Sequence, residues 1–203
     1  MRTNDNYAIC HAWVSNSFLK ELIHCGADVN ANNGLPLINA SRGNEIENII
    51  LLIENGADPT VNDNSPICDV CLYADMYTNI LSLKCLLDAN ADPNAQNGKP
   101  LKNCIRSKGW VEMLLNYGAS INYLNESDLC KVIFTKDFHT AKLLQSHGAD
   151  FTIINNKLWL RNNDLTEMEN LIELLGSNGV DLKSFALLLM FFSNLDLVKL
   201  YKY

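Results

Sequence analysis

The chain has 203 residues and a mass of 22.8 kDa, enough to bury a sizeable core in one domain or two small ones. Hydrophobic residues make up 48% and charged residues 19%, with only 10 Gly and 5 Pro, which excludes a disordered, a collagen-like or a disulfide-stapled small protein. The formal net charge of -7 repels phosphate backbones, so we expect no nucleic acid as a partner.

We expect neither a membrane-spanning segment nor a secretory signal peptide. The longest apolar run covers only 185–192, whereas a bilayer-spanning helix needs roughly 20 residues. The N-terminal segment lacks the positive region, apolar stretch and cleavage site of a signal peptide. The 7 cysteines are spread over apolar positions, which suits free thiols in a reducing compartment. We therefore expect an intracellular, cytoplasmic protein with no membrane partner, and a nuclear location stays open.

A short motif built around Gly-Ala-Asp recurs along the chain, with a period of about thirty residues. Its copies lie at 25–30, 55–60, 89–94, 117–122, 147–152 and 178–183. An apolar stretch precedes each copy, such as 46–55, in which apolar residues recur three and four positions apart. Each repeat is therefore predicted to contain an amphipathic helix that ends at the motif.

The second residue of each motif is predicted to end the helix, because Gly adopts positive φ without steric cost. These residues are Gly26, Gly56, Gly118, Gly148 and Gly179, with Asn90 in the remaining copy. Asn is the next best residue for the left-handed region. A polar turn follows, and then Pro36, Pro66 or Pro100 predicts the start of another helix, where no backbone donor is lost. Each repeat should therefore consist of a turn and two helices.

These helix pairs follow one another without a linker, which predicts a single all-α domain over 1–203. Its units are an N-terminal cap at 7–25, helix pairs at 36–55, 66–89, 100–117, 127–147 and 158–178, and a C-terminal cap at 184–203. The pair that opens at Pro66 should have a longer connection, around 74–79. The segment 155–169 is the least regular, because it has a polar run in a helix position and no opening proline.

The order Gly-Ala-Asp-x-Asn at 26–30, x-Pro-Leu at 35–37 and Ile-Leu-Leu-Ile-Glu-Asn-Gly at 50–56 resembles the ankyrin repeat. The resemblance runs from residue 7 to the C-terminus, and the short, Asn-rich repeats are similar to those of giant and other large DNA viruses. It implies a solenoid of stacked antiparallel helix pairs with short projecting turns and a concave face. No copy keeps the His of the family's Thr-Pro-Leu-His, so the hydrogen bonds that link neighbouring turns in the family must be absent or replaced.

Candidate chemical groups have structural explanations. Cys68 and Cys71 have the spacing of half a zinc site or of a redox pair, but no second pair exists, and small buried side chains on a first helix explain both. His147 precedes a Gly cap, where an imidazole meets free carbonyls. No nucleophile motif and no Gly-rich phosphate loop occurs. We therefore expect no enzyme activity, no catalytic residue, no metal site and no cofactor.

The resemblance also bears on modification. Some ankyrin proteins are hydroxylated on the Asn that follows the Gly-Ala-Asp motif, which corresponds here to Asn30, Asn94 and Asn122. The preference of Asn for turns already explains a residue of this type at these positions.

In such a solenoid, binding uses exposed positions that stacking leaves free. Arg42, Tyr73 and Arg106 lie six or seven residues after successive helix-opening positions, with Phe134 and Thr135 in the irregular unit. The turn tips add Asn32, Asn33, Asp63, Gln96, Tyr123 and Leu124. Arg and Tyr are enriched at binding hot spots, and Arg on an acidic protein suits a polar or acidic patch on a partner. We expect a module that binds another protein through its concave face and turn tips, and that protein is a host factor if the chain is viral.

Two other functions stay open. An adaptor that recruits a target to ubiquitin-dependent degradation would need a terminal module, for which 184–203 is too short. A metal protein or cryptic enzyme would use Cys68 and Cys71, and metal analysis would identify it. Separately, the apolar residues of 184–203 predict a surface patch that supports self-association or the docking of another protein.

Overall fold

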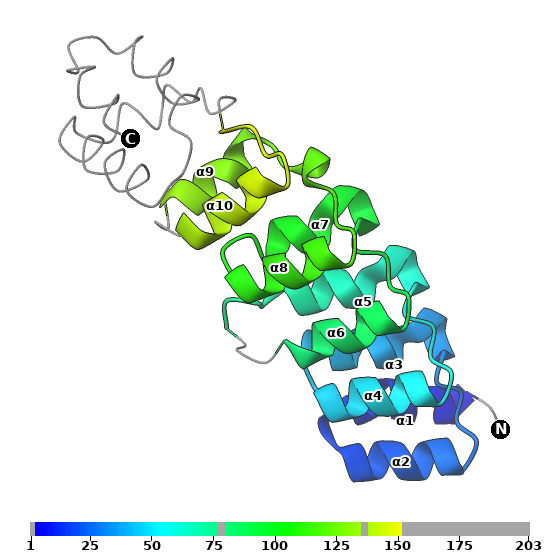
Figure 1. The fold of residues 1–203 in the computed structure, drawn as a ribbon. Coiled ribbons are helices and arrows are strands. Elements are labelled where there is room, and N and C mark those ends of the chain that lie inside the picture. Colours follow the sequence, from blue (N-terminus) through cyan, green and yellow to red (C-terminus); the bar gives the residue numbers. More distant parts are fainter. Residues whose placement is uncertain (1–2, 77–79, 135–137, 152–203) are drawn as a thin grey trace, which may run out of the picture. The chain divides into compact units, whose positions relative to one another are not determined.

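The computed structural model of the chain describes residues 3–76, 80–134 and 138–151 (Figure 1). The chain divides into two compact units, residues 1–120 and 121–203. Every regular element in the described ranges is a helix, which confirms the all-α prediction. The predicted C-terminal cap, the segment 155–169, Thr135 and Gly179 lie outside the described residues. The single-domain organisation and the unit boundaries stay predictions.

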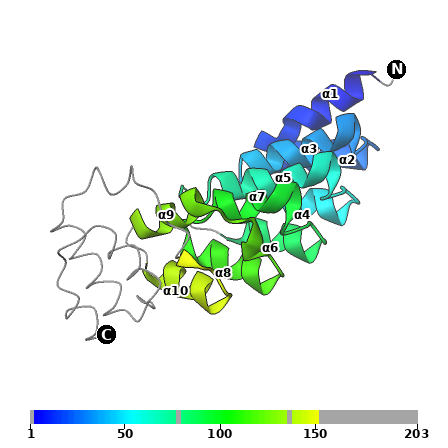
Figure 2. The same cartoon turned by 90° about the horizontal axis from the view of Figure 1, so that it is seen from above.

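The first unit is a stack of helix pairs. Its first helices are α1 (Thr3–His11), α3 (Ala31–Arg42), α5 (Val61–Leu72) and α7 (Ala95–Asn103), and its second helices are α2 (Asn16–His24), α4 (Ile46–Glu54), α6 (Leu81–Asp88) and α8 (Lys108–Asn116). A 3-10 helix, η1 (Ala12–Val14), joins α1 to α2. The first helices form one row in which α3 contacts α1 and α5, and α5 contacts α7 (Figures 1 and 2). Helices α2, α4 and α6 pack in the same order, which confirms the predicted solenoid arrangement within this unit.

Apolar side chains at equivalent positions hold the stack together. Leu37, Ile67 and Leu101 each follow a helix-opening proline and have no exposed surface. Leu52 and Leu86, on the second helices, are equally buried. Burying a side chain of this size contributes about 1.5–3 kcal/mol, so stability is shared among the repeats. None of the described helices is long and apolar enough to cross a membrane.

The predicted helix ends are confirmed wherever the structure describes them. The φ angle is 84° at Gly26, 88° at Gly56, 89° at Gly118, 92° at Gly148 and 69° at Asn90. The residue after each cap closes the helix with a backbone bond, as when the N–H of Ala57 donates to the carbonyl of Leu52 at 2.9 Å. This pairing satisfies a carbonyl that the helix end would otherwise leave free.

Helices α3, α5 and α7 each contain a left-handed kink near their start, and regular helix continues from the proline that follows it. All residues of 32–34, 62–64 and 96–98 have positive φ, between 50° and 75°. The N–H of the third residue bonds a carbonyl four residues back, for example from Gly34 to Asn30 at 3.1 Å. Side chains other than Asn, Asp and Gly seldom adopt this conformation. The Asn-rich composition of the turns therefore meets a backbone requirement, and the turns are short, as predicted.

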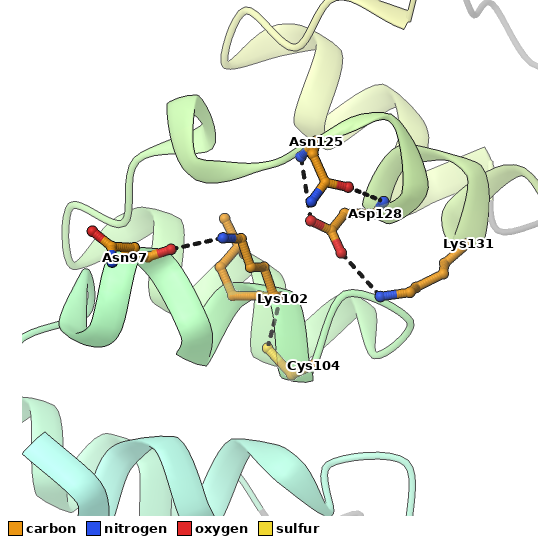
Figure 3. Close-up of polar contacts among 7 residues, drawn as sticks. Asn97, Lys102, Cys104, Asn125, Asp128 and Lys131 are labelled. Carbon is orange, nitrogen blue, oxygen red and sulfur yellow. Dashed lines mark hydrogen bonds and ion pairs between the residues drawn. The ribbon is translucent and has the colours of Figure 1, made fainter. Parts of the chain in front are cut away.

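The second unit opens its helix pair without a proline. Its described elements are η2 (Ile121–Tyr123), α9 (Glu126–Phe134) and α10 (Phe138–Ser146), and α9 packs against α10. The N–H of Asn125 donates to the Asp128 carboxylate at 3.2 Å, and the N–H of Asp128 donates to the Asn125 side-chain oxygen at 3.1 Å (Figure 3). This reciprocal capping satisfies backbone donors at the start of α9.

Candidate functional site

Side-chain amides set the register between neighbouring first helices. The amide of Asn39 on α3 donates to the carbonyl of Cys10 on α1 at 2.9 Å. The amide of Asn103 on α7 donates in the same way to the carbonyl of Cys68 on α5 at 3.0 Å. Because these bonds join equivalent positions, residues counted equally from each helix opening lie side by side along the row.

The sixth residue after each helix-opening proline is exposed: Arg42, Leu72 and Arg106. Arg42 and Leu72 are the last residues of α3 and α5, and Arg106 lies in the turn that follows α7. We refer to them as the Arg–Leu–Arg line. The sequence pattern predicted the two arginines but named Tyr73 instead of Leu72. Tyr73 is the next residue and is partly exposed, at 38%. Leu72 was missed because residue type alone does not distinguish an exposed Leu from a buried one.

Carboxylates of the middle repeat hold both arginines. Nε of Arg42 donates to Oδ2 of Asp69 on α5 at 3.0 Å. Nε of Arg106 lies 3.5 Å from Oδ2 of Asp75, and Oδ1 of Asp75 also accepts a bond from the Ser107 hydroxyl at 2.7 Å. The guanidinium groups are therefore positioned by neighbouring repeats, while about half of each arginine side chain stays exposed.

The predicted turn tips of the first unit are exposed or half-buried, and they are all left-handed: Asn32, Asn33, Asp63 and Gln96. Two of them meet, because the Gln96 amide donates to the Asp63 carbonyl at 3.0 Å. The Gln96 side-chain oxygen accepts a bond from Nζ of Lys99 at 2.9 Å. On the same turn, Nζ of Lys102 donates to the carbonyl of Asn97 at 2.8 Å (Figure 3). Adjacent turns thus present amides and ammonium groups together.

Asparagine side chains replace the missing histidine contacts between turns. The Asn30 amide donates to the carbonyl of Gly56 at 2.9 Å, and its oxygen accepts the N–H of Asp58 at 2.9 Å. Asn94 repeats the arrangement with the carbonyl of Gly118 at 3.0 Å and the N–H of Ser120 at 2.7 Å. Two of the three Asn positions considered for hydroxylation therefore link neighbouring turns.

The remaining predicted contact residues belong to the second unit. Tyr123 ends η2 and is 40% exposed, and Leu124 is half-buried. Phe134 is the last residue of α9. On α9, Nζ of Lys131 pairs with the buried carboxylate of Asp128 at 2.9 Å (Figure 3).

Cys68 and Cys71 are buried, and His147 lies at the end of α10. Burial raises the pKa of Cys68 to about 11 and raises the pKa of Cys71 well above its usual range, so both stay protonated thiols. Cys104 packs against Cys71, and its thiol donates to the Leu101 carbonyl at 3.8 Å (Figure 3). Nδ1 of His147 lies 2.8 Å from the carbonyl of Leu143, at the end of α10. Among the described residues, no three His, Cys, Asp or Glu side chains are arranged to hold a metal ion.

Comparison with known proteins identifies two relatives, both named as ankyrin repeat proteins of Acanthamoeba polyphaga mimivirus. The first is 32% identical over 154 residues, which is 73% of this chain and 47% of the relative. The second is 26% identical over 170 residues, which is 81% of this chain and 46% of the relative. The chain thus spans about half the length of the curated relatives it matches. No family model matches the sequence.

Proposed function

Because the chain belongs to the ankyrin-repeat proteins and is similar to those of a giant virus, we propose that it is a non-enzymatic module that binds another protein. Proteins of this type generally act as interaction modules. The observation that carries the proposal is the line of exposed side chains along the first helices, above all Arg42 and Arg106. These side chains take no part in the apolar core, and their residue type is enriched at binding hot spots.

Three features of this face support a role in recognition. The arginines are held in position by Asp69 and Asp75, so binding requires little further ordering of their side chains. Tyr73, the residue after Leu72, adds a partly exposed aromatic ring. The turn tips extend the same surface with amide groups on adjacent repeats. The viral relatives favour a host-cell protein, in the cytoplasm or nucleus, as the partner.

The test is to replace Arg42, Tyr73 and Arg106 together by Ala in the full chain. The melting temperature should stay near that of the wild type, because each arginine side chain is about half exposed and loses a single ion pair. Capture of a partner from cells that contain the protein, followed by mass spectrometry, should weaken strongly.

Lys84→Ala is the matched control, since it removes from second helix α6 an ion pair with Asp88 in which both side chains are 49% exposed. Partner capture by this variant should equal that of the wild type. If the triple variant retains full capture and a variant with Asn33→Ala and Gln96→Ala loses it, the turn tips are the binding site. If both variants retain it, this surface does not bind the partner.

A further inference from the structure

Charged and apolar side chains alternate in the Arg–Leu–Arg line. The side chains of Arg42 and Arg106 are 54% and 55% exposed, and Leu72, which lies between them, is 53% exposed. These two are the only arginines within the described ranges, and they occupy the same position in alternate repeats. Three successive repeats therefore present a cation, an apolar group and a second cation, at the ends of α3 and α5 and in the turn after α7.

The spacing of this line matches one type of extended ligand. Packed helices lie about 8–10 Å apart, so the ends of the line are separated by about 18 Å. A polyproline II segment rises about 3.1 Å per residue with three residues per turn, which places every third side chain on one side at intervals of about 9 Å. A β-strand turns side chains three apart to opposite faces, and an α-helix advances only about 4.5 Å in three residues. At a step of three residues, polyproline II alone offers one side chain to each repeat. An α-helix returns to the same face after seven residues, about 10.5 Å, which is longer than the 8–10 Å between packed helices.

The chemistry of the line favours carboxylates at its two ends. A guanidinium presents several N–H donors in a planar fork that matches a carboxylate. The ion pairs with Asp69 and Asp75 engage Nε, so the donors at the far end of each fork can bind a ligand. The Asp69 side chain is only 18% exposed and is thus largely covered, whereas the arginine beside it is open.

The centre of the line is apolar. Leu72 is next to Tyr73, and Met76 follows with 74% of its surface exposed. Leu72 thus offers an exposed apolar side chain that a single aliphatic ligand residue can cover. The loss of solvent from this surface supplies affinity, while the flanking arginines fix the position of the ligand.

We propose that the Arg–Leu–Arg line binds an acidic segment in the polyproline II conformation with the pattern acid–x–x–Leu–x–x–acid. Each of the three repeats contacts one side chain of the segment, and the pattern reads the same in both chain directions. The inference rests on the proposed function, and it specifies the class of partner: an unfolded, proline-containing acidic region of another protein. Such regions already populate this conformation, which lowers the entropy cost of binding.

The experiment measures binding of labelled peptides to the full chain by fluorescence anisotropy at low salt. The probe is Glu-Pro-Ala-Leu-Pro-Ala-Glu, and its control, Glu-Pro-Leu-Ala-Glu-Pro-Ala, has the same composition with the key residues two apart. The probe should bind at least tenfold more tightly than the control. Combined Arg42→Ala and Arg106→Ala substitution, or Leu72→Asp alone, should weaken probe binding tenfold or more, and Lys84→Ala should not change it.

A variant that should bind the probe more tightly distinguishes loss of binding contacts from misfolding. Asp69→Asn removes a negative charge that lies 3.0 Å from Arg42 and repels an acidic ligand, and Asn at this position can bond the preceding helix as Asn39 and Asn103 do. Probe binding should therefore tighten severalfold in this variant. Equal binding of the two peptides, unchanged binding by the arginine variants, or no binding at millimolar peptide would overturn the inference.

The two proposals fail differently. If the arginine substitutions abolish partner capture from cells but the peptides bind equally or not at all, the proposed function survives and the ligand class is wrong. If the probe binds as expected but the arginine substitutions do not change partner capture from cells, the ligand class is correct and the cellular partner binds another surface.

Discussion

The middle repeat of the first unit, residues 58–88, differs from the repeats on either side of it, 28–54 and 92–116, at several equivalent positions, of which four bear on contacts and exposure. Thr60 replaces Asn30 and Asn94, Asn64 replaces Gly34 and Gly98, Asp69 replaces Asn39 and Asn103, and Leu72 replaces Arg42 and Arg106. The first three exchanges act at contacts between repeats, and the fourth acts on the exposed line. The middle repeat therefore differs from its neighbours in how it is attached to them.

The contacts themselves persist although the residues change. Asn30 accepts the N–H of Asp58 at 2.9 Å, and at the next junction Asn64 accepts the equivalent N–H of Asp92 at 2.9 Å. Thr60 is too short to reach the next turn and bonds within its own turn, to Asp58. The stack thus requires an acceptor for this backbone donor, and two different positions can supply it.

The largest effect on stability is expected at Gly34, whose counterpart in the middle repeat is Asn64. A Cβ on Gly34 would lie 2.5 Å from the side chain of Val61, at a φ of 75°. We expect Gly34→Ala to lower the free energy of unfolding by about 3 kcal/mol, because left-handed strain and overpacking add. Gly56→Ala, at a φ of 88° with no atom within 4 Å of the new Cβ, should cost only about 1 kcal/mol. Urea titration measures both, and equal losses would contradict the packing argument.

Next in size is the contrast between Asn94 and Thr60. Asn94→Ala removes two bonds to the next turn, at Gly118 and Ser120, and should cost about 2 kcal/mol in the free energy of unfolding. Thr60→Ala removes one hydroxyl bond within its own turn and should cost about 0.5 kcal/mol. Chemical denaturation of both variants tests the difference. If Thr60→Ala costs as much as Asn94→Ala, the junction does not depend on the asparagine link.

A smaller effect is expected at Asp69, where the middle repeat has an ion pair in place of an amide bond. Asp69→Asn loses the pair with Arg42 but gains a donor for the carbonyl of Ile38, so the free energy of unfolding should change by less than about 0.5 kcal/mol. Asp69→Ala loses the ion pair and the bond from the Ser65 hydroxyl without that gain, and should cost about 1 kcal/mol. Thermal melts at two salt concentrations separate the cases. A large loss in the Asn variant would show that the charge itself is required.

The smallest effect concerns Asp88, which joins the middle repeat to the next one on the second-helix side. Hydrogen bonds from Lys84 and from the Tyr117 hydroxyl hold the pKa of Asp88 below its usual value of about 3.9. A lowered pKa stabilises the folded state above pH 4, and this stabilisation is lost as the pH falls through the lowered value. Asp88→Asn should therefore be slightly less stable than the wild type at pH 7 and equally stable below the lowered pKa. Melts across this range test it, and a difference that does not vary with pH would refute the charge effect.

Sequence alone determined the repeat, its period and the ends of its helices. Gly56 and Asn90 could be assigned to left-handed caps because φ depends on the residue itself and its neighbours. The buried face of the helix over 46–55, which includes Ile49 and Leu52, followed from the periodicity of apolar residues. All of these signals depend on residues within one or two helical turns of each other. They can therefore be recognised in the amino-acid sequence without knowledge of the tertiary structure.

The tertiary structure was needed to establish which side chains connect the repeats and which residues make up the Arg–Leu–Arg line. Arg42 and Asp69 are 27 residues apart in sequence, and Asn30 and Gly56 are 26 apart. Whether such pairs meet depends on the register of stacked helices and on the reach of each side chain, which apolar periodicity does not encode. The sequence identified the arginines as exposed, but their fixation by the middle repeat and the place of Leu72 between them result from the stacking of whole repeats.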